Sequence, residues 1–95
     1  MIRNYRVCFR AMAPVPTFQI HEVFYDNHYD IVGYEKAPAV AFGDITEELY
    51  ENFCEMMKAF DEVPLNLDHV DYLISQKEKE VSFANSSLRH FLSSG

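Results

Sequence analysis

The chain has 95 residues, a length that suits one domain and leaves no room for two. Apolar residues make up 48% of it and include 8 Phe and 6 Tyr, so the chain can bury a core and does not belong to the disordered class. Its 15 acidic side chains outnumber 8 basic ones, for a net charge of −7. This balance argues against direct nucleic-acid binding, because Lys and Arg supply most of the affinity for phosphates.

The only cysteines, Cys8 and Cys54, are too far apart in the sequence to form a C-x-x-C pair. We expect two free thiols in a reducing, cytoplasmic setting, since the first residues lead into no apolar signal segment. The longest apolar run covers residues 39–42, whereas a bilayer span needs roughly 20 residues. The sequence therefore predicts no membrane segment, and it indicates no cofactor.

Residues 1–16 are expected to form an N-terminal strand and a proline break. Over residues 3–11, side chains such as Tyr5 and Val7 alternate with polar ones such as Arg6, which is typical of a half-buried strand. Two prolines then remove backbone donors and end the strand.

Residues 17–42 are predicted to form a hairpin. Aromatic and branched residues favour a first strand over 17–25, and the polar segment 26–30 supplies the turn. A second strand is expected over 31–42, where Pro38 indicates an edge position, a bulge or a break.

The main helix is predicted over residues 44–62, because apolar residues recur there at steps of three and four. Asp44 is expected to cap its first turn, with Glu47 returning a hydrogen bond to the cap. The apolar stripe consists of Ile45, Leu49, Phe53, Met56, Met57 and Phe60.

A second, short helix is predicted over residues 68–76, followed by a polar tail over 77–95. The whole chain is then one α+β domain, in which a small antiparallel sheet packs against one main amphipathic helix. The other face of this sheet is expected to be uncovered and to mediate homodimer formation through Val23, Tyr25 and Tyr34.

Several short motifs between residues 18 and 68 resemble those of a family of short, uncharacterised bacterial proteins. The matching segments are Ile20-His21-Glu22-Val23-Phe24-Tyr25-Asp26, Gly33-Tyr34, Pro38, Gly43, Glu47-Glu48-Leu49, Met56-Met57-Lys58-Ala59 and Pro64-Leu65. The resemblance implies a hairpin followed by a helix and implies no activity. Tyr29 stands where that family often has a turn glycine, so we expect Asn27 or His28 to take any left-handed conformation.

Residues 43–48, Gly-Asp-Ile-Thr-Glu-Glu, are similar to the corner that leads into the amphipathic helix of HicB-family antitoxins. This resemblance implies a partly open sheet and helix that cover a partner protein. We expect no separate DNA-binding domain in the stretch after Pro64, which puts autoregulation in doubt.

Acidic residues are concentrated in the middle of the chain. Residues 17–72 hold thirteen acids against Lys36 and Lys58, for a charge of −11. Five of the acids recur at helical spacing and form what we call the acidic row: Asp44, Glu48, Glu51, Glu55 and Glu62.

The sequence thus favours a non-enzymatic, dimeric binding or regulatory module whose acidic row binds a basic partner such as a nuclease toxin. A solvated face that only maintains solubility is the simplest alternative interpretation. Another is an inhibitor of the phage-encoded kind that imitates the charge of nucleic acid.

A metal-binding protein or an enzyme is the alternative from a different class. His21, Asp26 and His28 are the candidate ligands, although their spacing matches no known metal motif. No catalytic residues are predicted, because no nucleophile, base and orienting group can be assembled from the sequence.

Overall fold

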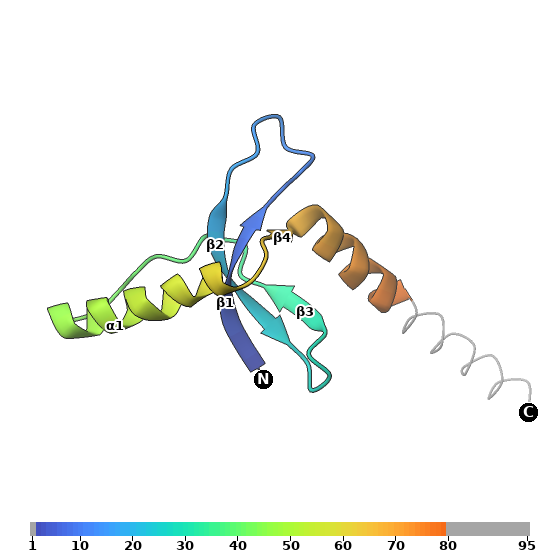
Figure 1. Ribbon diagram of the computed structural model, residues 1–95. Helices are drawn as coiled ribbons and strands as arrows, with labels where there is room; N and C mark the ends of the chain where they lie inside the picture. The colour runs from blue at the N-terminus through green and yellow to red at the C-terminus, as the bar shows by residue number, and fades with distance from the viewer. Residues whose placement is uncertain (1, 80–95) are drawn as a thin grey trace, which may run out of the picture.

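The computed structural model describes residues 2–79 (Figure 1). Its elements are β1 (Ile2–Phe9), β2 (Gln19–Tyr25), β3 (Ile31–Tyr34), α1 (Thr46–Met57), the 3-10 helix η1 (Lys58–Asp61) and β4 (Leu65–Asn66). A second helix follows β4 and is described over residues 67–79. The predicted α+β class is confirmed.

The four strands form one sheet in the order β3-β2-β1-β4. β2 pairs antiparallel with both β1 and β3, so the predicted hairpin is confirmed. β4 pairs parallel to β1, with Cys8 opposite Leu65. The sheet is therefore mixed, not purely antiparallel as expected from the sequence.

Two strands end earlier than the sequence predicted. The predicted ends were residue 11 for the first strand and residue 42 for the second strand of the hairpin. β1 stops at Phe9, because the Ala13 N–H donates to the Arg10 carbonyl at 3.3 Å and closes a turn ahead of the prolines. β3 stops at Tyr34, and Pro38 interrupts the segment that was expected to continue it.

The chain beyond β3 nevertheless stays beside β2. The Glu35 N–H donates to the Glu22 carbonyl at 2.9 Å, and the Ala39 N–H donates to the Ile20 carbonyl at 2.7 Å. These two bonds hold the start of the segment that crosses to α1.

The β2–β3 turn is built around Asp26. Its carboxylate accepts the N–H groups of His28 at 2.8 Å and of Asp30 at 3.0 Å. Tyr29 takes the left-handed conformation, with φ of 63°, so the expectation that Asn27 or His28 would do so is wrong. The Asp26 side chain stabilises a backbone shape that would otherwise favour glycine.

The helix over 67–79 covers the sheet face that was expected from the sequence to be uncovered. Val23 and Tyr25 are buried on that face with Cys8 and Leu67, and Tyr34 packs against this cluster. The expectation that Val23, Tyr25 and Tyr34 lie on an uncovered dimer face is therefore wrong. They belong to the core of a single chain, because β4 pairs with β1 and places the start of the second helix, with Leu67, against them.

The main helix starts at Thr46, and its cap differs from the prediction. The N-cap is Ile45, whose side chain makes no cap hydrogen bond. The Glu48 carboxylate accepts the Asp44 N–H at 3.0 Å, so Glu48 takes the role expected of Glu47. The main helix was predicted to end at residue 62. The second helix begins five residues later, at residue 67, directly after β4.

The second helix begins at residue 67, and Asn66 caps it in place of the predicted Asp68. The Asn66 Oδ1 accepts the N–H of Asp68 at 3.1 Å and also that of Ala11 at 3.4 Å. Residues 77–79 of the predicted tail continue this helix, and 80–95 lie outside the described residues. Neither helix, over the part of the chain that is described, combines the length and apolar character of a membrane span.

Candidate protein-interaction surface

α1 lies on the sheet face opposite the second helix and extends beyond the edge of the sheet (Figure 1). The Asn52 Nδ2 donates to the Tyr5 hydroxyl at 3.4 Å, which places this part of α1 over the Tyr5 side of β1. Met56 is the one buried residue of α1, and Ala59 of η1 is fully buried next to it. The helix is thus anchored to the sheet through its C-terminal half, from Asn52 onward.

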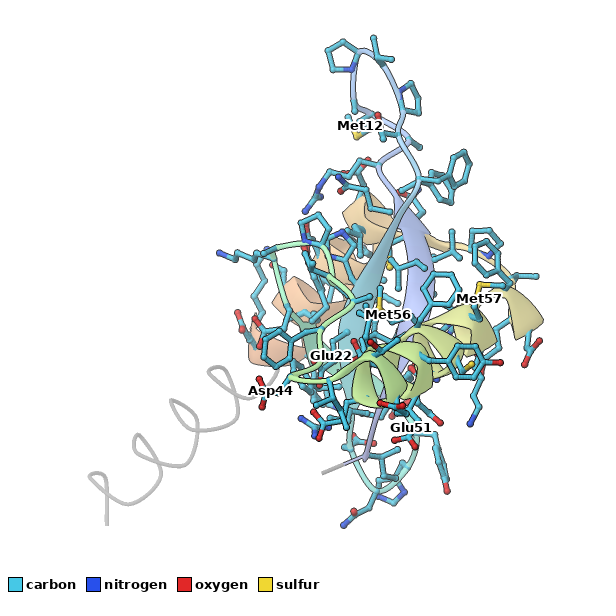
Figure 2. All side chains as sticks on the ribbon, turned by 90° about the vertical axis from the view of Figure 1, so that its left-hand side faces the viewer. Met12, Glu22, Asp44, Glu51, Met56 and Met57 are labelled. Carbon is cyan, nitrogen blue, oxygen red and sulfur yellow. The ribbon has the colours of Figure 1, made fainter. Side chains whose placement is uncertain are left out.

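The structure places the whole acidic row on the surface. Asp44 precedes α1, three members lie within α1, and Glu62 follows η1, and all five residues are exposed. Figure 2 shows Met56 near the strands, with Glu51 on the far side of the helix. Helical geometry puts the three members within α1, Glu48, Glu51 and Glu55, on one side of the helix.

Three members of the acidic row have partners within the chain. Glu48 accepts the Asp44 N–H, as described above, and Glu55 accepts from the Lys58 ammonium at 2.8 Å. Glu62 forms an ion pair of 2.9 Å with Arg6. Within residues 2–79, the carboxylates of Glu51 and Asp44 make no polar contact, and Glu51 is the one of these two that lies within α1.

A groove of about 480 Å³ runs between α1 and the sheet beside the acidic row. Four carboxylates and two cationic groups line it, so it carries an excess of negative charge. Polar residues complete the wall. The lining residues are Arg3, Asn4, Tyr5, Glu22, Asn52, Glu55, Lys58, Asp61 and Glu62.

Most of the charges in this groove are already paired. Arg3 lies 3.1 Å from Glu22 on the sheet side, and Lys58 pairs with Glu55 on the helix side. Asp61 has no ion pair among the described residues, and the paired Glu55 and Glu62 side chains are still 60% and 52% exposed, so these three carboxylates remain accessible to a cationic side chain. We find no nucleophile beside a general base among its lining residues.

The opposite flank of α1 carries an exposed apolar surface. We define the apolar face as Ile45, Leu49, Phe53, Met57 and Phe60. These side chains are 42–64% exposed, although helical periodicity predicted that they would pack on the sheet. The expectation of a fully packed stripe is wrong for all its members except Met56, because the sheet lies under the Met56 and Ala59 side of the helix.

The candidate metal ligands have structural roles instead. His21 is buried, and its Nδ1 lies 2.8 Å from the Glu35 carbonyl, which can only accept a hydrogen bond. Hydrogen bonds from the Asp30 backbone and from Lys77 hold the pKa of the Asp26 carboxyl below its usual range. His28 is exposed in the turn. Across residues 2–79, the structure assembles no group of three or more His, Cys, Asp and Glu side chains that suits a metal ion.

Both cysteines are free thiols. Cys8 is buried in the core, and burial raises the pKa of its thiol, so it is held in the protonated, less nucleophilic form. Cys54 is half-buried on α1. Neither thiol lines the groove beneath α1.

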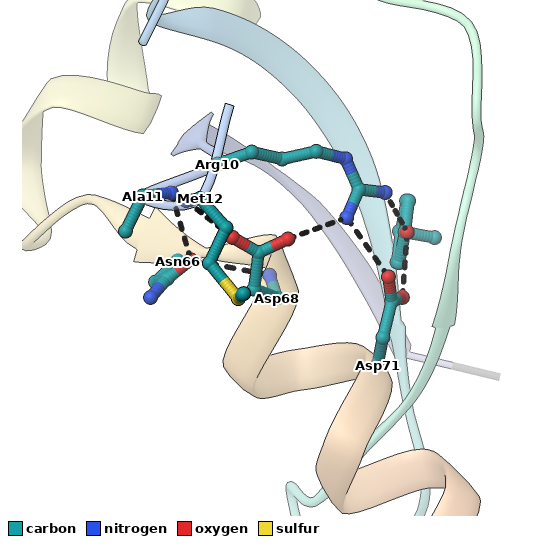
Figure 3. A network of polar contacts seen from close by, with 7 residues as sticks. Arg10, Ala11, Met12, Asn66, Asp68 and Asp71 are labelled. Atoms are coloured by element: carbon teal, nitrogen blue, oxygen red, sulfur yellow. Dashed lines mark hydrogen bonds and ion pairs between the residues drawn. The ribbon is translucent and has the colours of Figure 1, made fainter. Parts of the chain in front are cut away.

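A polar network that the sequence did not single out joins β1, β3 and the second helix (Figure 3). The Arg10 guanidinium pairs with Asp68 at 3.1 Å and with Asp71 at 2.9 Å, and it donates to the Tyr34 hydroxyl at 2.8 Å. Asp68 also accepts the Met12 N–H at 2.9 Å. The i, i+3 spacing of the two aspartates was the one available signal, but their cation, Arg10, lies 58 residues before Asp68 and 61 before Asp71.

Comparisons of the chain with protein-family models, with curated proteins and with solved structures found no match. The resemblances to the short bacterial family and to HicB-family antitoxins therefore stay predictions. The fold and its surface define a small α+β domain with one exposed amphipathic helix.

Proposed function

We propose that this protein is a non-enzymatic binding module whose acidic row docks onto a basic surface of another protein. The observation that carries the proposal is the exposure of α1, which buries one side chain and presents its acids to solvent. Residues 46–57 contain four glutamates and no basic residue, so the helix itself carries a charge of −4. A surface of one sign speeds the encounter with an oppositely charged partner and excludes partners of like charge.

The groove beneath α1 supports the same proposal. Its volume of about 480 Å³ is ample for Arg or Lys side chains, and Glu55 and Glu62 belong to both the groove and the acidic row. A partner that inserts a guanidinium would find several carboxylates within one concave site, where bidentate pairing is strongest. The partner class is therefore a protein with clustered arginines or lysines.

Charge reversal at Glu51 is the sharpest test, because this side chain makes no polar contact within the described residues. The immobilised full chain is used to capture partners, each captured protein is purified, and its affinity is measured by titration. We expect Glu51→Lys to weaken binding at least about tenfold, and about 0.5 M salt to weaken binding to the wild type. Glu78→Lys, an equal change of charge at an exposed site on the other helix, serves as the control.

Identical affinities for the wild type, Glu51→Lys and Glu78→Lys would contradict the proposal and leave the acidic row as a solvated face. If the protein is instead an inhibitor that imitates nucleic acid, duplex DNA should displace it from its partner, because both would occupy one basic site.

A further inference from the structure

The apolar face of α1 is too large to be explained as scattered surface hydrophobic residues. Tyr50 extends the face at helical spacing from Phe53 and Met57 and is 69% exposed, and Phe42, which precedes α1, is 70% exposed. With them, the exposed area of the face is roughly 800 Å², since an aromatic side chain alone offers about 150–250 Å². A typical monomer exposes no apolar patch above about 600 Å².

α1 also needs cover in order to be stable. It has 12 residues, and isolated helices of this length are marginal in water. Within the described residues, its packing is limited to the buried Met56 and the half-buried Asn52 and Cys54, and Asn52 accepts the Phe42 N–H at 2.8 Å and donates to the Tyr5 hydroxyl at 3.4 Å. Most of the stabilisation of a protein helix comes from burial of its apolar face, which residues 2–79 do not provide for α1.

We propose that the apolar face of α1 is the seam of a homodimer, in which the same face of a second copy covers it. The area of roughly 800 Å² per copy equals what each partner contributes to a standard stable interface. Phe, Tyr and Met, which make up most of this face with its flanks, are also the residues enriched in interface cores. An occupant on which the helix depends must be present whenever the chain folds, and a second copy always is.

The placement of charge on α1 agrees with this seam. At 100° per residue, the glutamates at 48, 51 and 55 lie about 150° around the helix from the centre of the apolar face. Two copies can therefore join their apolar faces in an isologous contact while both acidic rows remain in solvent. The seam and the acidic row use opposite flanks of α1, so this proposal and the binding function can fail independently.

Light scattering of the full chain at about 10 μM tests the assembly. We expect a mass of twice the chain's 11.1 kDa. Leu49→Glu with Phe53→Glu should weaken the dimer at least about 100-fold, because two apolar anchors would become charged. Val15→Glu is the matched control, since Val15 is an exposed apolar residue in the β1–β2 connection and should leave the dimer intact.

A photoreactive benzoylphenylalanine in place of Phe53 keeps the test valid if the double variant fails to fold. In a mixture of isotopically light and heavy chains, we expect crosslinks between residues 45–60 of one copy and residues 45–60 of the other. A wild-type mass of one chain would overturn the proposal. So would crosslinks confined to one chain, or a dimer that is unaffected by both glutamates.

Discussion

The Arg6 guanidinium donates a hydrogen bond of 3.1 Å to the hydroxyl of Tyr25, and both residues are buried. A second nitrogen of Arg6 donates to the Val63 carbonyl at 2.7 Å, and Glu62 completes an ion pair. A side chain on the same side of β1 as the core residue Cys8 thus joins β1 to β2 and to the segment that leads from η1 to β4. These three partners offset the cost of burying the Arg6 cation.

We expect Arg6→Ala to lower the free energy of unfolding by about 3 kcal/mol, because the Val63 carbonyl and the Tyr25 hydroxyl would lose a charged donor. The matched control is Arg3→Ala on the same strand. The Arg3 side chain is 70% exposed and its pair with Glu22 lies near solvent, so the loss should be about 0.5 kcal/mol. Urea titration measures both values. Equal losses of unfolding free energy in Arg6→Ala and Arg3→Ala would show that Arg6 does not link β1 to β2 and to the segment before β4.

Gly43 lies so close to α1 that a side chain there would collide with the helix backbone. A Cβ at this position would approach the Leu49 nitrogen and lie 2.7 Å from the carbonyl carbon of Glu48. We expect Gly43→Ala to cost about 2 kcal/mol in the free energy of unfolding, because the backbone has to move.

Gly33 is the matched control for this substitution. A Cβ there would meet only the Phe24 ring, at 4.0 Å, which is an ordinary contact distance. Gly33→Ala should therefore change stability by less than about 0.5 kcal/mol, since alanine also restricts the unfolded chain. Thermal and urea unfolding measure the stability of the two variants. Similar losses of unfolding free energy in Gly43→Ala and Gly33→Ala would refute the close approach at Gly43.

The network around Arg10 predicts a loss of stability in acid. Burial raises the pKa of the Asp71 carboxyl, but hydrogen bonds from Tyr34 and Arg10 outweigh burial and hold this pKa below its ordinary value. A carboxyl with a depressed pKa in the folded state stabilises the fold above its unfolded pKa, near pH 4, and ceases to do so as the pH falls through the folded value.

We therefore expect the urea midpoint of the wild type to fall more steeply below about pH 4 than that of Asp71→Asn. Tyr34→Phe keeps Arg10 but removes the hydroxyl donor. The fall of its urea midpoint with pH should therefore be intermediate between those of the wild type and Asp71→Asn. Measurements at pH values from about 2 to 7 give these slopes. The same slope in all three proteins would rule out a contribution from Asp71.

Local patterns were sufficient to predict the hairpin and α1. Alternation of side chains and the polar turn specify β2 and β3, and the spacing of apolar residues specifies the helix. The strand ends were less accurate, because they depend on single residues. Tyr29 adopts the left-handed conformation only because Asp26 holds the turn, and a sequence pattern does not contain that contact.

The acidic row was predictable and the apolar surface beside it was not. Glu48, Glu51 and Glu55 share one side of α1 through helical geometry alone. The exposure of Leu49 and Phe53 depends on where the sheet lies relative to the helix, which no local pattern specifies.

The hairpin, the two helices, the α+β class and the placement of charge along α1 could be predicted from the sequence, because each depends on residues close together in the chain. The parallel strand β4 and the choice of buried faces could not, since they depend on contacts between distant segments. The second helix covers Val23 and Tyr25, Arg6 is enclosed by partners from distant segments, and the apolar face of α1 is left exposed. Burial is a property of long-range contacts, and the same amphipathic pattern is compatible with cover by the chain's own sheet or by another molecule.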